Sequence, residues 1–125
     1  MSEKISSFTQ LRTWQKARQL AVQLYRLAES FPASERFGLS SQVKRAAASI
    51  AANIAEGFSR NGKRDKIQFY AIALGSLTET VSHCYIAFDL GYLSKDDLHI
   101  IESESTDLHK MINGLIKSAQ ERNNT

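Results

Sequence analysis

The chain of 125 residues is long enough for one domain of ordinary size, and its 42% hydrophobic and 23% charged residues argue against intrinsic disorder. One Pro and six Gly provide too few turns for a β-sandwich, and a single Cys excludes an intrachain disulfide. The N-terminal segment MSEKISSF lacks the apolar run of a signal peptide, and residues 67–88, the least charged long stretch, are too polar to span a membrane. We therefore expect a soluble, cytoplasmic, helix-rich protein without a membrane partner.

The first predicted helix covers residues 9–30, where apolar side chains recur at steps of three and four. Pro32 ends it, because proline lacks the N–H group that a continuing helix needs. The face opposite the leucines is cationic. Its Arg12, Lys16 and Arg26 can follow a phosphate backbone without reading sequence, which makes them candidate nucleic-acid contacts. The alternative is that these charges only solvate the helix.

The second predicted helix covers residues 39–56, with Gly57 as its C-terminal cap. Placing its residues at intervals of about 100° separates three faces. The core face contains Val43, Ala47, Ile50 and Ile54. A second face, which we name the polar stripe, contains Gln42, Arg45, Ser49, Asn53 and Glu56. Between these two faces lies a surface of small residues, Ala48, Ala51, Ala52 and Ala55.

So few solvating charges on the second helix indicate that it is contacted on more than one side. Because small residues let another backbone come close, we interpret the four alanines as an oligomer interface, and a compact monomer with a bland surface is the alternative. Within the polar stripe, Arg45 is expected to pair with Glu79 or Glu56, since a buried charge without a partner is unfavourable. The stripe is then either a structural network that fixes packing register or a ligand site.

A basic loop, SRNGKRDK, precedes the third predicted helix, which covers residues 65–90. Further candidate phosphate contacts in or beside this loop are Arg60, Lys63, Arg64 and Lys66. The expected core stripe of the helix consists of Ile67, Tyr70, Leu74, Leu77, Val81, Tyr85 and Phe88. A semi-apolar face beside it, another reason to expect subunit contacts, consists of Phe69, Ala73, Ser76, Thr80, Cys84 and Ala87.

Gly91 is expected to cap the third helix, and Ser94 with Asp97 resembles a capping box at the start of the fourth, residues 95–121. Four helices of similar length with short connections pack most simply as an antiparallel, up-down-up-down four-helix bundle. The predicted fold is therefore all-α, with a single domain over residues 1–125.

Catalytic and metal-binding patterns are not found in the sequence. His83, His99, His109 and Cys84 lack zinc-ligand spacing, and the paired Glu-x-x-His motifs of a di-iron bundle are missing. There is no glycine-rich phosphate loop, and Cys84 lies on the flank of a buried stripe, where packing is the expected role. We expect no enzyme activity, no metal and no cofactor.

Several segments resemble the 23S ribosomal RNA intervening-sequence protein family over residues 8–118: LRTWQKARQLAVQLY, RAAASIAANIAEG, GSLTE and LGYL. The resemblance implies an antiparallel four-helix bundle that assembles into a ring-like homopentamer, and it adds no catalytic residue. Some relatives are similar to the accessory variability protein of diversity-generating retroelements, which binds nucleic acid and a reverse transcriptase. The positions that recur in the family fall on Arg45, Ser49, Asn53, Glu56, Gly57, Ser76 and Glu79, so the resemblance adds Ser76 and Glu79 to the polar stripe.

The net charge of +3 hides an asymmetry that bears on function. Residues 1–66 carry twelve Lys and Arg against five Asp and Glu, whereas residues 67–125 carry four against eight. This pattern favours either a basic surface for an anionic partner or complementary surfaces between copies of the chain. Two hypotheses follow: a homo-oligomer that binds RNA or DNA as an accessory protein, and a protein-interaction scaffold that binds no nucleic acid.

Overall fold

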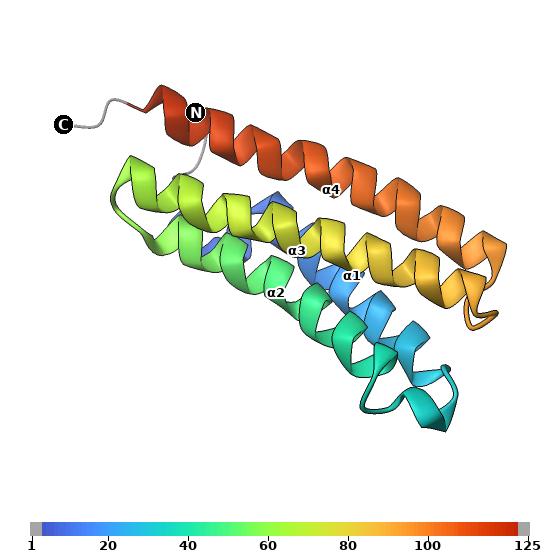
Figure 1. The fold of residues 1–125 in the computed structure, drawn as a ribbon. Helices are drawn as coiled ribbons and strands as arrows, with labels where there is room; N and C mark the ends of the chain where they lie inside the picture. The colour runs from blue at the N-terminus through green and yellow to red at the C-terminus, as the bar shows by residue number, and fades with distance from the viewer. Residues whose placement is uncertain (1–3, 123–125) are drawn as a thin grey trace.

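The computed structural model describes residues 4–122, and the regular secondary structure of that range is entirely helical. Four long helices are preceded or separated by two short 3-10 helices. In chain order the elements are η1 (Phe8–Gln10), α1 (Arg12–Glu29), η2 (Ala33–Glu35), α2 (Leu39–Ser59), α3 (Lys63–Asp89) and α4 (Lys95–Glu121). Figure 1 shows the long helices side by side with alternating direction, so the predicted all-α, four-helix fold is confirmed.

The helices pack in a closed square, because each contacts its neighbour in the chain and α1 also contacts α4. The α1–α2 pair therefore lies on the opposite side of the bundle from the α3–α4 pair. The four core residues predicted on α2 are all buried, at 0–1% exposure. Among the described residues, no helix is both long and apolar enough to cross a membrane.

Local signals set the junction between α3 and α4. α4 begins and ends at the predicted residues, and the Ser94 hydroxyl accepts a hydrogen bond from the Asp97 N–H at 3.1 Å. At the end of α3, Gly91 adopts a φ of +81°, a conformation that favours glycine. The Gly91 N–H donates to the Phe88 carbonyl and the Tyr92 N–H to the Ala87 carbonyl, both at 2.9 Å, which completes a Schellman motif.

Gly57 has a different role from the predicted one. It lies inside α2, which continues to Ser59, and a Cβ at this position would stand 2.6 Å from Cε1 of Tyr70. Gly57 is therefore needed for the close approach of the Tyr70 ring, and it does not cap the helix. Because α3 already begins at Lys63, the predicted basic loop is reduced to residues 60–62.

The core stripe predicted for α3 is only partly buried, and the face beside it is buried more completely. Four members of the stripe, Ile67, Leu74, Val81 and Phe88, are half-buried and pack against the core. Of the expected core stripe only Tyr70 and Leu77 are buried, and Tyr85 is 44% exposed. On the face expected to be semi-apolar, every residue except the half-buried Phe69 is buried: Ala73, Ser76, Thr80, Cys84 and Ala87. Hydrophobicity alone favours the bulky side chains for the core, but small side chains allow the closest packing of two helices.

Candidate nucleic-acid interface

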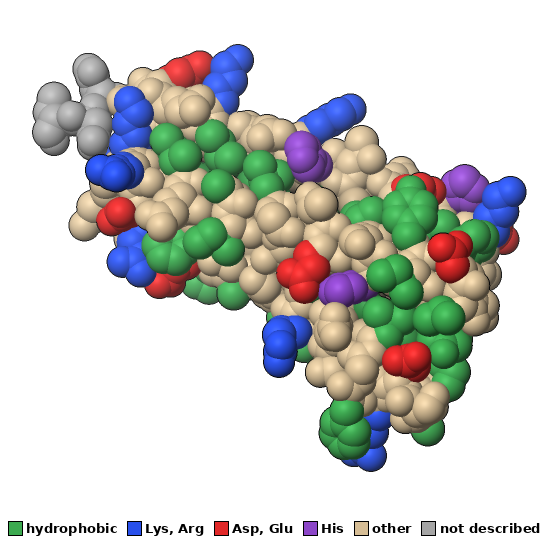
Figure 2. Space-filling view, viewed as in Figure 1, with side chains coloured by type: hydrophobic (Ala, Val, Ile, Leu, Met, Phe, Trp, Pro, Cys, Tyr) green, Lys and Arg blue, Asp and Glu red, His purple; other side chains and the backbone are tan. Residues whose placement is uncertain are grey.

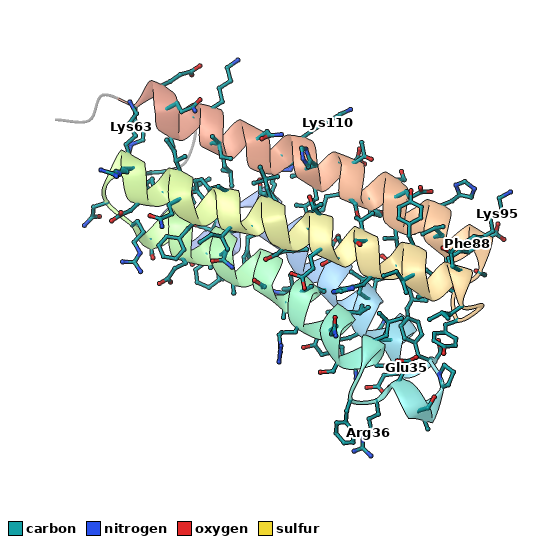
Figure 3. All side chains as sticks on the ribbon, viewed as in Figure 1. Glu35, Arg36, Lys63, Phe88, Lys95 and Lys110 are labelled. Atoms are coloured by element: carbon teal, nitrogen blue, oxygen red, sulfur yellow. The ribbon has the colours of Figure 1, made fainter. Side chains whose placement is uncertain are left out.

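One end of the bundle is rich in cations. α1 and α3 begin there and α2 and α4 end there, so residues from all four helices meet around the 60–62 connection. We name this surface the basic end; its cationic residues are Arg12, Arg60, Lys63, Arg64, Lys117 and Arg122. The nearby carboxylates are Glu56, Asp65 and Glu121. Figure 2 shows several Lys and Arg side chains projecting at this end, and Figure 3 labels Lys63 among them.

The cations in and beside the 60–62 connection differ in whether they have an ion-pair partner. Arg60 forms an ion pair with Glu56 at 2.8 Å, and its guanidinium lies 4.7 Å from the centroid of the Phe69 ring. Lys63 and Arg64 lie in the first turn of α3, half-buried and exposed respectively, and no carboxylate of residues 4–122 is paired with either. These two side chains are therefore available to an external anion.

Lys66 does not belong to this exposed surface, which corrects the expectation from the sequence. The residue is only 8% exposed, and its ammonium group donates hydrogen bonds to the carbonyl oxygens of Gly57 at 3.2 Å and Phe58 at 2.8 Å. These carbonyls belong to the last turn of α2, where backbone donors are scarce; the Gly57 carbonyl also accepts from the Arg60 N–H at 3.3 Å. Burial lowers the pKa of Lys66, and the nearby charge of Arg122 lowers it further. Lys66 of α3 thus caps the C-terminus of α2.

The cationic face predicted for the first helix is divided by the packing of α1 on α4. Lys16 forms an ion pair with Glu104 of α4. Arg12 lines a groove of about 560 Å³ that also contains Asp107. Arg26 lies near the other end of α1, in a groove of about 610 Å³ that contains Asp97. Acidic α4 residues thus share the seam with all three cations, and of the three only Arg12 lies in the first turn of α1, at the end of that helix toward the basic end.

The polar stripe forms a hydrogen-bonded seam between α2 and α3. The hydroxyl groups of Ser49 and Ser76 lie 2.8 Å apart, and the Asn53 side-chain amide donates to the Ser49 carbonyl at 2.8 Å and to its hydroxyl at 3.0 Å. Ser76 is buried, whereas Ser49 and Asn53 are half-buried. This arrangement is what a network that fixes helix register requires.

The charged members of the polar stripe are not paired as expected. Glu56 pairs with Arg60, and Glu79 pairs with His83 at 3.2 Å, each with a neighbour four residues along its own helix. Arg45 is exposed and has no ion-pair partner within the described range. The expected pairing of Arg45 with Glu79 or Glu56 is therefore wrong for the single chain. Residues at this spacing lie on the same side of a helix and meet without crossing a seam.

The remaining positions predicted on α2 are exposed or half-buried. Gln42 is exposed. Of the four alanines, Ala48 and Ala52 are exposed and Ala51 and Ala55 are half-buried.

Cys84 is buried, and this burial raises the pKa of its thiol to about 12. At neutral pH the thiol is therefore protonated and is not a nucleophile. Residues 4–122 contain no cluster of three or more His, Cys, Asp and Glu side chains arranged to hold a metal ion.

A groove of about 750 Å³, which the sequence did not predict, lies on the outer side of the α3–α4 pair. Its apolar lining includes Leu77, Val81 and Ile86, and the Tyr85 hydroxyl donates a hydrogen bond to Glu102 across it. Adjacent Tyr85 and Ile86, at 44% and 47% exposure, both line the groove, whereas the spacing of apolar residues predicts Tyr85 for the core. The groove is open to solvent and larger than the seam grooves of α1.

Comparison with known proteins agrees with the fold and the sequence motifs. A profile of the 23S rRNA-intervening sequence protein family matches residues 9–114. A crystal structure from Bacteroides thetaiotaomicron VPI-5482, described as a protein with unknown function from the S23 ribosomal protein family, superposes with a TM-score of 0.78 and 26% sequence identity. The similarity covers 84% of this chain and 95% of that one. No curated protein matches significantly. The match of the profile over most of the sequence shows that this chain belongs to the 23S rRNA-intervening sequence protein family.

Proposed function

We propose that this protein is a non-enzymatic, homo-oligomeric accessory protein that binds the phosphate backbone of RNA or DNA through its basic end. The observation that carries the proposal is the pair Lys63 and Arg64, two cations without an ion-pair partner among residues 4–122, at the end of the bundle where Arg12 and Arg122 also lie. Cations held on helix ends can contact phosphates and release counterions from them.

The local backbone favours an anion at the same place. α3 begins at Lys63, and the preceding Gly62 provides no side-chain cap, so the N–H groups of the first turn are left for other acceptors. Such a helix N-terminus attracts phosphate oxygens. These contacts are to the backbone of a nucleic acid and carry no base information, so binding is expected to be independent of sequence.

Repetition of the basic end in an assembly would strengthen weak single contacts through multivalency. Five copies are the favoured number from the family resemblance. Each additional basic end on the same nucleic acid raises the effective concentration of the next contact, so the oligomer is expected to bind long strands more tightly than short ones.

The test is a salt titration of binding to fluorescent RNA, single-stranded DNA and duplex DNA. Affinity should fall by orders of magnitude between about 50 and 200 mM salt for a surface that contacts several phosphates. The variant Lys63→Glu/Arg64→Glu should weaken binding to all three. The matched control is Arg36→Glu/Lys95→Glu, which makes the same charge change at the opposite end of the bundle (Figure 3) and should retain more affinity.

Equal weakening by the two double variants would show that only net charge matters and would remove the basic end from the proposal. No binding by the wild type at low salt would favour the second candidate, a protein-interaction scaffold. That candidate is supported by exposed apolar side chains, among them Val22 at 46%, Tyr85 at 44% and Ile86 at 47%.

A further inference from the structure

We infer that the α3–α4 groove binds a small amphipathic amine, a molecule with an ammonium group at one end, a hydrogen-bond acceptor in its middle and an apolar group at the other end. The inference goes beyond the proposed function, because the groove runs toward the α3–α4 connection, at the opposite end of the bundle from the basic end. Every residue that lines the groove belongs to α3 or α4, whereas the alanines expected at an oligomer interface belong to α2.

The groove has the size and the lining of a site for an organic molecule. Its volume of about 750 Å³ lies within the range of about 300–1,000 Å³ that is usual for such sites. Leu77, Val81 and Ile86 supply an apolar lining. Figure 2 shows hydrophobic and acidic side chains next to one another over α3 and α4, toward their connection. An apolar group seated here would remove exposed apolar surface from water.

Ser105 supplies a hydrogen-bond donor that nothing in the chain uses. The residue lines the groove and is 5% exposed, and its hydroxyl oxygen is the one buried side-chain polar atom of residues 4–122 without a hydrogen-bond partner. The adjacent Thr106 differs, because its hydroxyl donates to the Glu102 carbonyl at 2.9 Å. Buried hydroxyl groups nearly always have a partner, so the Ser105 hydroxyl points to an acceptor on a bound molecule.

The half of the groove nearest the α3–α4 connection is suited to an ammonium group. Asp89 and Glu102 line it, and Asp89 has no ion-pair partner among residues 4–122. Glu102 accepts the hydrogen bond from the Tyr85 hydroxyl and lies 3.4 Å from Nδ1 of His99. The Tyr85 ring, 44% exposed beside these carboxylates, adds an aromatic surface of the kind that cations favour. Two carboxylates and an aromatic ring together can hold one ammonium group.

The other half of the groove fixes the direction of the ligand. His109 and Lys110 line it, and Figure 3 labels Lys110 midway along α4. The Lys110 charge repels a second ammonium group, so an amine with an apolar far end is preferred to a diamine. Glu102 and Ser105 are three residues apart on α4, or about 4.5 Å along its axis. The acceptor that meets Ser105 therefore lies within a short spacer of the ammonium group.

The experiment measures the binding of dansylcadaverine to the full chain through the change in dansyl fluorescence. This probe has an ammonium group, an apolar spacer, a sulfonamide whose oxygens accept hydrogen bonds, and a naphthalene ring. The matched probe, dansyl-ε-aminocaproate, has the same dansyl group and spacer but ends in a carboxylate. The variants are Asp89→Asn/Glu102→Gln and Ser105→Ala. The control, Asp65→Asn/Asp96→Asn, removes two carboxylates at exposed positions outside the groove.

We expect the wild type and the control to bind dansylcadaverine equally, and more tightly than the carboxylate probe. Asp89→Asn/Glu102→Gln should weaken binding of the amine by about tenfold or more, because it removes the charges that face the ammonium group. Ser105→Ala should weaken it by about threefold to tenfold without lowering the melting temperature of the free protein, since the hydroxyl has no partner among residues 4–122.

Two results would overturn the inference at the level of the ligand: equal affinity for the two probes, which would mean capture of an apolar dye alone, and no binding of either probe. A Ser105→Ala variant with a lower melting temperature and an unchanged affinity would overturn it as well, because the hydroxyl would then have a structural partner.

Discussion

The two seams that join α2 to its neighbour α3 and α1 to its neighbour α4 are built from different residues and pack differently. At the α2–α3 seam, Gly57 admits the Tyr70 ring, and Ser49 and Ser76 meet at 2.8 Å. At the α1–α4 seam, Lys16 reaches Glu104 beside grooves of about 560 and 610 Å³. Small residues allow two helices to pack closely, whereas long charged residues keep them further apart and leave solvent between them.

The largest difference between the seams should appear when methyl groups are removed. Ile54 in α2 is fully buried, so Ile54→Ala should lower the free energy of unfolding by about 2–5 kcal/mol. Ile116 in α4 is only half-buried, and Ile116→Ala should have a smaller effect. Urea denaturation of both variants measures the difference. Equal losses would contradict the difference in burial between Ile54 and Ile116.

A methyl group added at Gly57 should also destabilise the protein. Gly57→Ala places a Cβ 2.6 Å from the Tyr70 ring, and such overpacking typically lowers stability by about 1–3 kcal/mol. Gly114 in α4 has open space at the same atom, so Gly114→Ala should stabilise the helix by up to about 1 kcal/mol. Thermal melts that shift in the same direction for both variants would contradict the close approach at Gly57.

The hydroxyl pair of the α2–α3 seam should contribute less. Ser76→Ala removes the partner of Ser49 and should lower stability by about 1 kcal/mol. Ser82, an exposed serine on the same helix, provides the control, and Ser82→Ala should change stability within about 0.5 kcal/mol. If the two variants have the same melting temperature, packing alone sets the register of the seam.

The smallest effect is expected at the α1–α4 seam. Lys16→Ala removes the ion pair with Glu104, whose side chains are 23% and 41% exposed, and should change stability by about 0–1 kcal/mol. That difference should shrink further as salt is added. If Lys16→Ala at low salt lowered the free energy of unfolding as much as Ile54→Ala does, the stability of the seam would depend on charge.

The sequence predicted the parts of the fold that depend on local signals. Hydrophobic spacing located the four long helices, and Gly91 and Ser94 marked the junction between α3 and α4. Gly57 was misjudged because a helix-ending glycine and a close-contact glycine look alike in sequence. Its partner Tyr70 is thirteen positions away, and only the packing of α2 on α3 brings the two together.

The candidate site was predictable in composition but not in arrangement. The cations of residues 60–66 were visible, yet the sequence cannot show that Lys66 turns inward to the carbonyls of α2. Nor can it show that Glu104 neutralises Lys16, since these residues are 88 positions apart. Groove formation at Tyr85 depends on how α3 is rotated between its two neighbours, which buries small residues such as Ala73 and Ser76 and leaves Tyr85 at the surface.

The three-residue connection between α2 and α3 has a consequence for the order of folding. It joins two helices that pack along small residues, so their contacts need little loop closure, whereas the contact of α1 with α4 must close most of the chain. We expect the α2–α3 hairpin to form early and to exchange its amide hydrogens most slowly, with α1 and α4 opening at lower free energy. Pulsed hydrogen exchange would then show protection spreading outward from the connection that also carries Lys63 and Arg64.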